Sequence, residues 1–501
     1  MILARGRLAS LALILMAAAI TLAVRWQGIG DIVAHADEQF YLLVGDHMLN
    51  RGAVPYAGIW DRKPVGLFLL YAGIRLLGGE GIVQYQLVAL LAVAATSGML
   101  ALWIARYSSW MGAVAGVMLY NGLLVSHLGF GGQAEVFLNL LMVAAGWLVH
   151  RMVVDEKPGN RRLLVAGGTA MLLCGLAIQV KPTAVLPGGF LGLALIWAAW
   201  RSGLGWKPIS MLALFWAGLA LLPTLLAILA YWAMGLLDQW LFANVFSIFE
   251  KAPDRAVAVA GRIADIRREF GRPFTVAAVL ALAQCAVRRE ERSWVSTLYL
   301  LGWLLSGVAA FAVLSAAYPH YALVMAPMGC LLAGYAVRGN LPGYALALWL
   351  LNLSLDNMKL YERRLEASAP VAAQIRSMAA AIQPYLTAGR CLYVYHGPVI
   401  LYQLTGACIP TRFAFPNHLS IRTEATGLGI DPAAEVKRII ASRPAVIVDG
   451  AFGFHQPNPA TQRLVRAELG RHYQPAAQVK DGRGVLLAVA YVRRPAVPTG
   501  R

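Results

Sequence analysis

The residues most able to do chemistry lie just after the first long apolar run of the chain. Asp37 and Glu38 are neighbours there, and Lys63 follows in the same hydrophilic connection. Acids and a cation are expensive to hold beside a bilayer and usually have a task. A carboxylate can take a proton from a hydroxyl, and a lysine ammonium is a compact charge that suits a phosphate. The stretch therefore predicts acid–base chemistry on an anionic substrate beside a membrane.

Each of these residues also has an ordinary structural interpretation. Asp37 can serve as the N-cap of a helix over Gln39–Leu49, and Lys63 can extend its side chain to lipid headgroups. Asp37 and Glu38 are sequence neighbours, so their side chains diverge in a helix and in a strand alike. We therefore expect one of the two acids to act as a base while the other orients a neighbouring group.

Four further residues extend the set of candidates. Glu135 opens an apolar run, Lys181 lies between two runs, and His320 and Tyr321 lie in a short connection between later runs. Their structural interpretations are a helix-dipole acid, a headgroup-seeking lysine and an interfacial aromatic belt. The functional interpretation is that all of them face one cavity with Asp37. Because they come from distant parts of the chain, this convergence is a hypothesis.

The remaining histidines and cysteines favour neither a metal site nor a hydrolase. His396, His418 and Asp449 could belong to a hydrolytic site, but no serine or cysteine stands in a nucleophile-elbow pattern. No cluster of His, Cys and acidic residues has zinc spacing, and we expect no metal and no cofactor.

The composition indicates a membrane protein that crosses the bilayer many times. Of the 501 residues, 59% are hydrophobic and only 14% are charged, whereas soluble domains carry about 25% charged residues. The net charge of +18 comes from basic residues between apolar runs, not from one basic face. Such charge reflects orientation in the membrane and anionic lipid headgroups, so we do not expect nucleic acid as a partner.

The apolar runs predict about eleven transmembrane helices. We interpret the first, Leu8–Val24, as an uncleaved span with the amino terminus inside, and cleavage after Ala17–Ala19 is the alternative. The expected spans are Leu8–Val24, Val83–Ile104, Met111–Ser126, Glu135–His150, Leu163–Val180, Pro182–Trp200, Ile209–Leu237, Phe274–Val287, Trp294–Ala317, Tyr321–Val337 and Leu341–Leu355.

Two hydrophilic connections are longer than the others. The first, 25–84, contains the apolar segments Phe40–Leu49 and Val65–Leu77, which are too short to span and are expected to lie on the membrane surface. The second, 238–273, contains a mixed-charge helix over Ile263–Phe270.

The basic residues orient the chain. Lysine and arginine concentrate in cytoplasmic loops, and on the expected topology the short outer segments hold only Lys181. We therefore place Asp37, Glu38, Lys63 and the carboxyl-terminal part outside. The basic residues placed inside are Arg5, Arg7, Arg106, Arg151, Lys157, Arg161, Arg162, Arg201, Lys207, Arg288, Arg289, Arg292 and Arg338.

The chain divides into a membrane module, 1–356, and an extracytoplasmic α/β domain, 357–501. Cys391 and Cys408 of this domain could pair if it lies outside, whereas Cys174, Cys285 and Cys330 are typical of small buried residues. The expected helices of the domain are Val371–Leu386, Ala433–Ala441 and Thr461–Leu469, and the expected strands are Cys391–Tyr395, Ala445–Asp449 and Gly484–Val492.

The motif Asp37-Glu38, followed by Tyr41 and then by Lys63-Pro64, resembles a known family. It is similar to the GT-C superfamily of polyprenyl-phosphate-sugar-dependent glycosyltransferases. The similarity is to the bacterial branch related to protein O-mannosyltransferases and to the aminoarabinose transferase of lipid A. That family carries an Asp-Glu pair early in the first extracytoplasmic loop, then an aromatic residue, then a Lys-Pro that opens a surface helix.

Later residues extend the resemblance. Glu135 matches a second acidic position that opens a later span. Lys181-Pro182 resembles the lysine at the outer end of a following span, and His320-Tyr321 resembles an aromatic outer turn before a late helix. The aminoarabinose branch has a carboxylate directly before the lysine of Lys-Pro, where this chain has Arg62, so the resemblance does not imply its metal site.

The resemblance implies an inverting sugar transfer at the outer face of a bacterial inner membrane. The donor would be a sugar on a polyprenyl phosphate, and the acceptor a hydroxyl of a lipid, a glycan or a protein. Asp37 would act as base, with Glu38 beside it, and Lys63 would hold the leaving phosphate with help from Lys181. Tyr41, Glu135, His320 and Tyr321 would bind substrate.

Two other classes of function are the alternatives. A transporter or flippase of a lipid-linked sugar would show inverted repeats and broken helices near the bilayer midplane, and the sequence shows no paired repeats. In a scaffold subunit of an envelope assembly, the acids would serve only as helix caps.

Overall fold

The structure is a computed structural model that describes residues 2–33, 35–154, 158–314, 316–387, 389–453 and 455–495. Lys157, used above to orient the chain, lies outside the described residues. The chain folds into two compact units. The first comprises Met1–Ile29, Gln86–Ala230 and Arg255–Glu362, and the second comprises Gly30–Tyr85, Tyr231–Asp254 and Arg363–Arg501.

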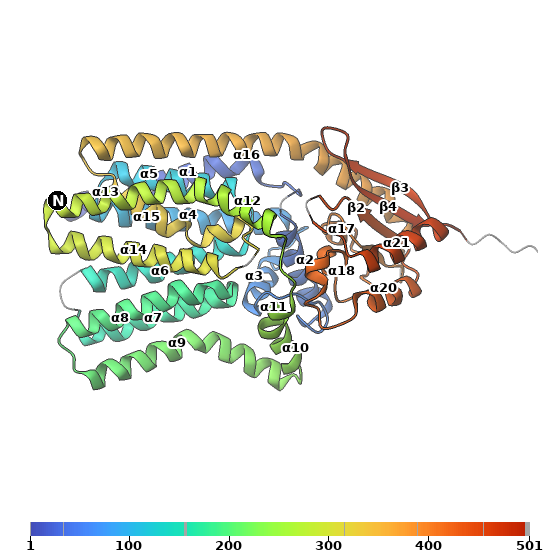
Figure 1. Cartoon of the computed structure of the whole chain (residues 1–501), viewed down its shortest axis with the longest axis horizontal. Coiled ribbons are helices and arrows are strands. Elements are labelled where there is room, and N and C mark those ends of the chain that lie inside the picture. Colours follow the sequence, from blue (N-terminus) through green and yellow to red (C-terminus); the bar gives the residue numbers. More distant parts are fainter. Residues whose placement is uncertain are drawn as a thin grey trace, which may run out of the picture. The chain divides into compact units, whose positions relative to one another are not determined.

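The first unit consists of long apolar helices, most of them drawn in blue to yellow in Figure 1. Three helices, α4, α9 and α16, continue into residues of the second unit. The elements are α1 (Ile2–Arg25), η1 (Trp26–Gly28), α4 (Ile82–Tyr107), α5 (Trp110–Ser126), α6 (Ala134–Val154), α7 (Asn160–Val180), η2 (Pro182–Ala184), α8 (Val185–Arg201), α9 (Trp206–Ala233), α12 (Ala256–Ile266), η4 (Arg267–Gly271), α13 (Arg272–Arg288), α14 (Glu291–Ala312), η5 (Pro319–Val324), α15 (Ala326–Ala336) and α16 (Leu341–Ile382).

The expected class of fold is confirmed, because the chain is a multi-pass helical membrane protein. Eight helical stretches of the described residues are long and apolar enough to cross a membrane. The expected spans Met111–Ser126 and Tyr321–Val337 correspond to shorter apolar helices, α5 and α15. The count of about eleven spans therefore stays a prediction.

Small residues let the helices of the first unit approach closely. A side chain at Gly112 of α5 would meet the Gly334 carbonyl oxygen of α15 at 2.2 Å. A side chain at Gly146 of α6 would meet the Trp303 ring of α14 at 2.4 Å. Without a hydrophobic driving force between helices in lipid, such close backbone contact supplies much of the packing energy. The second of these contacts lies on α6, the helix that carries Glu135.

Two short helices of the first connection belong to the second unit. They are α2 (Ala36–Arg51) and α3 (Val65–Arg75), where the two short apolar segments predict them. Gly45 of α2 allows close packing, since a Cβ there would lie 2.7 Å from the Ala72 nitrogen of α3. Arg75 also donates to Asp46 across the same pair at 2.8 Å. The second connection contributes α10 (Leu237–Leu241), η3 (Phe242–Phe246) and α11 (Ser247–Glu250).

The carboxyl-terminal residues of the second unit build a four-stranded sheet with the order β1-β2-β4-β3. Strand β1 (Leu392–Val394) pairs parallel with β2 (Val446–Gly450), and β4 (Leu486–Arg493) pairs antiparallel with β2 and β3 (Tyr473–Lys480). The helices here are α17 (Leu401–Thr405), α18 (Pro416–Ser420), α19 (Arg422–Ala425), α20 (Pro432–Ala441) and α21 (Pro459–His472), with a short η6 (Gln383–Tyr385) after α16.

The α/β prediction is confirmed with one strand added. The sequence does not predict β3, because Pro475 interrupts its pattern and only an edge strand tolerates a proline. Cys391 and Cys408 form a disulfide bond, while Cys174, Cys285 and Cys330 are free and buried. The compact units also group 30–85 and 231–254 with the carboxyl-terminal residues.

Candidate functional site

Helix α2 begins earlier than expected, and this changes the place of Asp37. The N-cap is His35, whose ring nitrogen Nδ1 accepts the Asp37 backbone N–H at 3.3 Å. The N-cap interpretation of Asp37 is therefore wrong, because Asp37 lies inside the first turn. A carboxylate in the first turn is favoured by the helix dipole. The Asp37 side chain is 17% exposed, so it can still meet a substrate.

Asp37, Tyr41 and Lys63 lie together within the second unit. The Tyr41 hydroxyl, one turn after Asp37, donates to Asp37 Oδ2 at 3.5 Å. Lys63 Nζ lies 6.0 Å from the centroid of the same tyrosine ring. Glu38 differs from its neighbour in being completely buried, as expected if the two side chains diverge. The predicted order of acid, aromatic and lysine is thus a spatial group as well as a sequence pattern.

The backbone at Lys63 is held by buried contacts. The Tyr56 hydroxyl donates to the Lys63 carbonyl at 2.8 Å, and the Tyr56 ring packs on Tyr231 with 5.3 Å between centroids. Pro64 then caps α3, so Lys63 stands directly before a helix start. This arrangement fixes where the lysine side chain begins.

Asp61 is a site residue that the sequence analysis missed. Its Oδ1 accepts the Arg62 backbone N–H at 2.7 Å and lies 3.9 Å from His418 Nε2. Burial raises the pKa of Asp61 to about 6, Lys63 opposes the rise, and the Asp37 carboxylate adds to it. Asp61 is therefore within electrostatic reach of both Lys63 and Asp37. The sequence carries a signal for it, because Asp61 is an acid two positions before Lys63.

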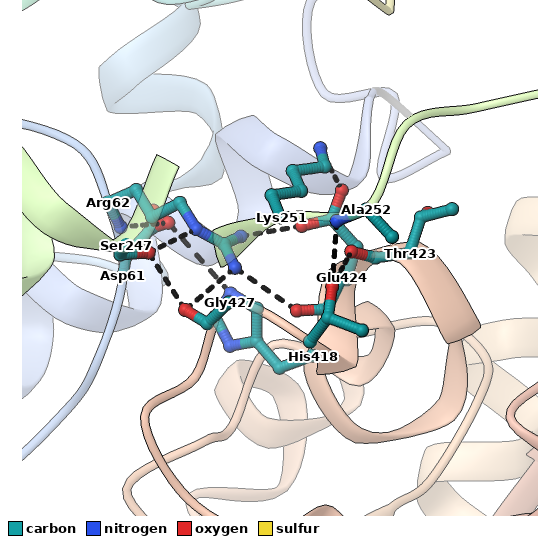
Figure 2. Close-up of polar contacts among 10 residues, drawn as sticks. Asp61, Arg62, Ser247, Lys251, Ala252, His418, Thr423, Glu424 and Gly427 are labelled. Carbon is teal, nitrogen blue, oxygen red and sulfur yellow. Dashed lines mark hydrogen bonds and ion pairs between the residues drawn. The ribbon is translucent and has the colours of Figure 1, made fainter. Parts of the chain in front are cut away.

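Arg62 is the centre of a charged network from three separate segments of the second unit (Figure 2). It donates from Nη1 to Glu424 Oε2 at 2.6 Å and from Nε to Ser247 Oγ at 2.6 Å. Its Nη2 donates to the Gly427 carbonyl at 3.1 Å, and Lys251 pairs with the other Glu424 oxygen. We call these four side chains, Arg62, Ser247, Lys251 and Glu424, the Arg62 network.

Two titrating groups of this region have shifted pKa values. Burial alone would raise the pKa of Glu424, but Lys251 and Arg62 overcome it and lower the value to about 2. Burial, with Arg62 beside it, holds the pKa of His418 well below its usual value. His418 is therefore neutral near pH 7, and its contact with Asp61 is not an ion pair there.

Glu135, Lys181, His320 and Tyr321 form a second group, within the first unit. Glu135 and Lys181 are in direct contact as an ion pair. Lys181 Nζ lies 4.2 Å from the Tyr321 ring centroid, and the His320 ring lies 4.6 Å from that of Tyr321. Glu135 is completely buried and Lys181 is 6% exposed, so the interpretation of Lys181 as a headgroup-seeking lysine is wrong.

The predicted site residues thus form two groups, one in each unit. That the two groups serve a single site stays a prediction. Among the described residues, no cluster of three or more His, Cys, Asp and Glu side chains could hold a metal ion. The expectation that no metal takes part also stays a prediction.

Comparison with known proteins finds similar proteins by structure alone. No family model matches the sequence, and no curated protein matches it. ArnT from Cupriavidus metallidurans in the apo state is 14% identical, with a TM-score of 0.65 over 96% of this chain and 98% of that one. The same ArnT bound to undecaprenyl phosphate has a TM-score of 0.63.

The chain has a GT-C fold. The oligosaccharyltransferase of Archaeoglobus fulgidus shares it at a TM-score of 0.50 and 12% identity, over 98% of this chain and 75% of that one. The resemblance seen in the sequence is therefore confirmed at the level of the fold. It extends beyond the membrane helices, since the ArnT likeness covers nearly the whole chain.

Proposed function

We propose that this protein is a membrane glycosyltransferase that moves a sugar from a polyprenyl-phosphate donor to an acceptor hydroxyl. The observation that carries the proposal is the spatial group of Asp37, Tyr41 and Lys63 on a GT-C fold. An acid and a cation near the same tyrosine provide the two functions that the reaction needs, a base and a phosphate ligand. The structure of ArnT with undecaprenyl phosphate supports the choice of donor lipid.

Asp37 acts as the base in this proposal. Its carboxylate takes the proton of the acceptor hydroxyl, and the oxygen attacks the anomeric carbon on the side opposite the phosphate. The bond from carbon to phosphate oxygen breaks, its electron pair leaves with the polyprenyl phosphate, and the anomeric configuration inverts. The Tyr41 hydroxyl, which donates to Asp37 at 3.5 Å, orients the carboxylate.

Lys63 stabilises the leaving phosphate, because a cation placed where negative charge develops lowers the barrier. Asp61 modulates this role. As a carboxylate it opposes a phosphate at Lys63, and as a neutral acid it does not. With its pKa at about 6, Asp61 changes charge close to physiological pH. Phosphate binding and protonation of Asp61 are therefore expected to favour each other.

The remaining predicted residues supply the surroundings of the substrate. In this proposal Glu38, adjacent to the base, orients it, and the role of Glu135, Lys181, His320 and Tyr321 in the first unit is to bind substrate. The ion pair between Glu135 and Lys181 makes this second group electrically balanced. We assign it to substrate binding and not to the chemical step.

The site belongs on the periplasmic face of a bacterial inner membrane. The bias of basic residues places Asp37 and Lys63 outside. The disulfide between Cys391 and Cys408 supports an oxidising compartment for the carboxyl-terminal residues. Flipped lipid-linked sugars are available there. The acceptor is a lipid such as lipid A, a glycan or a protein, and the carboxyl-terminal α/β domain selects it.

The test is mass spectrometry of envelope lipids, glycans and proteins from cells with and without the gene. The proposal expects one class of molecule to lose the mass of a single sugar when the gene is absent. Complementation with the natural chain restores this mass, and complementation with Lys63→Ala does not. An unchanged envelope, or full restoration by Lys63→Ala at equal protein level, would contradict the proposal.

A further inference from the structure

The short helical segment 237–250, made of α10, η3 and α11, has an unusual distribution of side chains. Trp240, Ala243 and Ser247 are buried at helical spacing and form its inner face. Between its first and last turns, the segment carries no charged residue. Its two acids, Asp238 and Glu250, stand near its two ends.

The inner face is attached to the rest of the second unit by polar contacts. Ser247 donates to the Gly427 carbonyl at 2.8 Å and accepts from Arg62 at 2.6 Å (Figure 2). Directly after the segment, Lys251 pairs with Glu424, and the Ala252 N–H donates to Thr426 Oγ1 at 2.8 Å. The segment is therefore held to the 424–427 turn at several points, and its outer face has a defined direction.

The outer face is apolar and strongly exposed. It consists of Val245, Phe246, Ile248 and Phe249, which are 39%, 54%, 54% and 82% exposed. A helical face made of large apolar side chains is normally buried and does not suit water. Four large apolar side chains at adjacent helical positions are also more than the scattered exposed residues of an ordinary surface.

The neighbouring membrane helix indicates what covers this face. Helix α9 is one of the stretches able to cross a membrane, and it ends at Ala233, only a short turn before Leu237. Trp232 and Met234, at that end, are 67% and 48% exposed. Exposed apolar side chains thus occur both at the end of a membrane-length helix and in the segment 237–250 that follows it in the chain.

We propose that Val245, Phe246, Ile248 and Phe249 insert into the lipid surface and anchor the second unit to the membrane at the end of α9. Apolar side chains of an amphipathic segment enter the boundary between headgroups and acyl chains in this way. A side chain as exposed as Phe249 projects from the protein surface, and a lipid surface can cover such a side chain. A single polyprenyl chain would need a groove.

The anchor has a consequence for the candidate site. The same residue, Ser247, accepts from Arg62, and Arg62 lies between Asp61 and Lys63 in the sequence. Through the contact between Ser247 and Arg62, the anchor therefore fixes the distance of the loop that carries Lys63 from the lipid surface. This inference needs only that the chain is a membrane protein, so it stands or falls independently of the proposed glycosyl transfer.

The test uses the full chain in nanodiscs of phosphatidylethanolamine and phosphatidylglycerol. Phe249→Cys is labelled with a small environment-sensitive fluorophore, and Ile248→Cys serves as a second reporter if the first variant fails to fold. Arg483→Cys, on the turn between β3 and β4, is the matched control, because Arg483 is 90% exposed on the same unit. The free cysteines Cys174, Cys285 and Cys330 are buried. The natural chain is treated with the same fluorophore to check that these cysteines do not react.

The expected result is quenching of the Phe249→Cys label by brominated lipid, several-fold stronger than for Arg483→Cys, with weak quenching by iodide in water. Iodide quenching equal to that of the control would overturn the inference. Quenching by neither agent would also overturn it, because the face would then be covered by protein. Lipid quenching that develops only after undecaprenyl phosphate is added would assign the face to the donor chain and equally overturn it.

Discussion

The two groups of predicted site residues differ in the burial and the pairing of their charged side chains. In the first unit, Glu135 and Lys181 are in direct contact and both are buried. In the second unit, Asp37 keeps 17% of its side chain exposed and accepts from Tyr41, and Lys63 Nζ lies 6.0 Å from the centroid of the Tyr41 ring. A base must reach an acceptor from solution, and a fully buried ion pair cannot. If the proposed transfer is right, the difference favours the second unit for the chemical step and a binding or structural task for the first.

The largest effect on stability is expected from breaking the first-unit pair. Glu135→Gln leaves the buried Lys181 ammonium without its acid, and such a loss costs about 3–5 kcal/mol of unfolding free energy. Thermal and denaturant unfolding in detergent measures the change. Glu135→Gln combined with Lys181→Met should recover most of the loss. If Glu135→Gln is as stable as the natural chain, the ion pair of Glu135 and Lys181 does not stabilise the first unit.

For the group of Asp37, Tyr41 and Lys63, substitutions are expected to change the rate of sugar transfer and not the stability. Lys63→Ala should lower the rate of sugar transfer about a hundredfold, because the leaving phosphate loses its cation. Lys63→Arg should retain more activity, since it keeps the charge but alters the geometry. Initial rates with a polyprenyl-phosphate sugar give the measurement, and unchanged unfolding confirms the fold. A normal rate of sugar transfer for Lys63→Ala would contradict the role of Lys63 in the chemical step.

The Arg62 network predicts an acid-sensitive fold. The pKa of Glu424 is lowered to about 2 in the folded chain, so its contribution to stability is complete above the ordinary glutamate pKa. The contribution is lost as the pH falls from that value toward 2, and about 2–3 kcal/mol is at stake. Between pH 7 and pH 3, the free energy of unfolding should therefore fall less for Glu424→Gln than for the natural chain. An equal fall in the free energy of unfolding for both proteins would contradict the role of Glu424 in the acid sensitivity.

A smaller effect is expected at Asp61. Its pKa is raised to about 6, so the side chain is neutral below that pH and becomes a carboxylate above it. The lipid phosphate also titrates at about pH 6, so the Asp61 effect is the difference between two proteins. From pH 5 to pH 7, the affinity of the natural chain for undecaprenyl phosphate should fall relative to that of Asp61→Asn, by less than about tenfold for one partly screened charge. Titrations in nanodiscs would reject the idea if both proteins showed the same slope.

Local patterns in the sequence predicted much of the fold. Apolar runs predicted the membrane helices, and the short runs in 25–84 predicted α2 and α3. The grouping of Asp37, Tyr41 and Lys63 also followed from local order, since all three lie at or near the starts of these two helices. The start of α2 was misplaced because histidine is not among the usual N-cap residues, so His35 gave no signal.

Contacts between distant segments could not be predicted in this way. Arg62 and Glu424 are separated by 362 positions, and nothing in a single sequence shows that they meet. The contact of Asp61 with His418 could not be predicted for the same reason, because His418 lies in the carboxyl-terminal part. Strand β3 required its partner β4, since its own sequence contains a proline.

The most direct test of the account is the transfer rate of Asp37→Asn beside its matched control Asp46→Asn. Both acids lie on α2, but Asp46 pairs with Arg75 and holds α2 to α3. Initial rates are measured with purified protein, a polyprenyl-phosphate sugar and the acceptor found by mass spectrometry. The account predicts a loss of about 10²–10⁴-fold for Asp37→Asn and nearly normal transfer for Asp46→Asn. Normal transfer by a folded Asp37→Asn protein would contradict the assignment of Asp37 as the base.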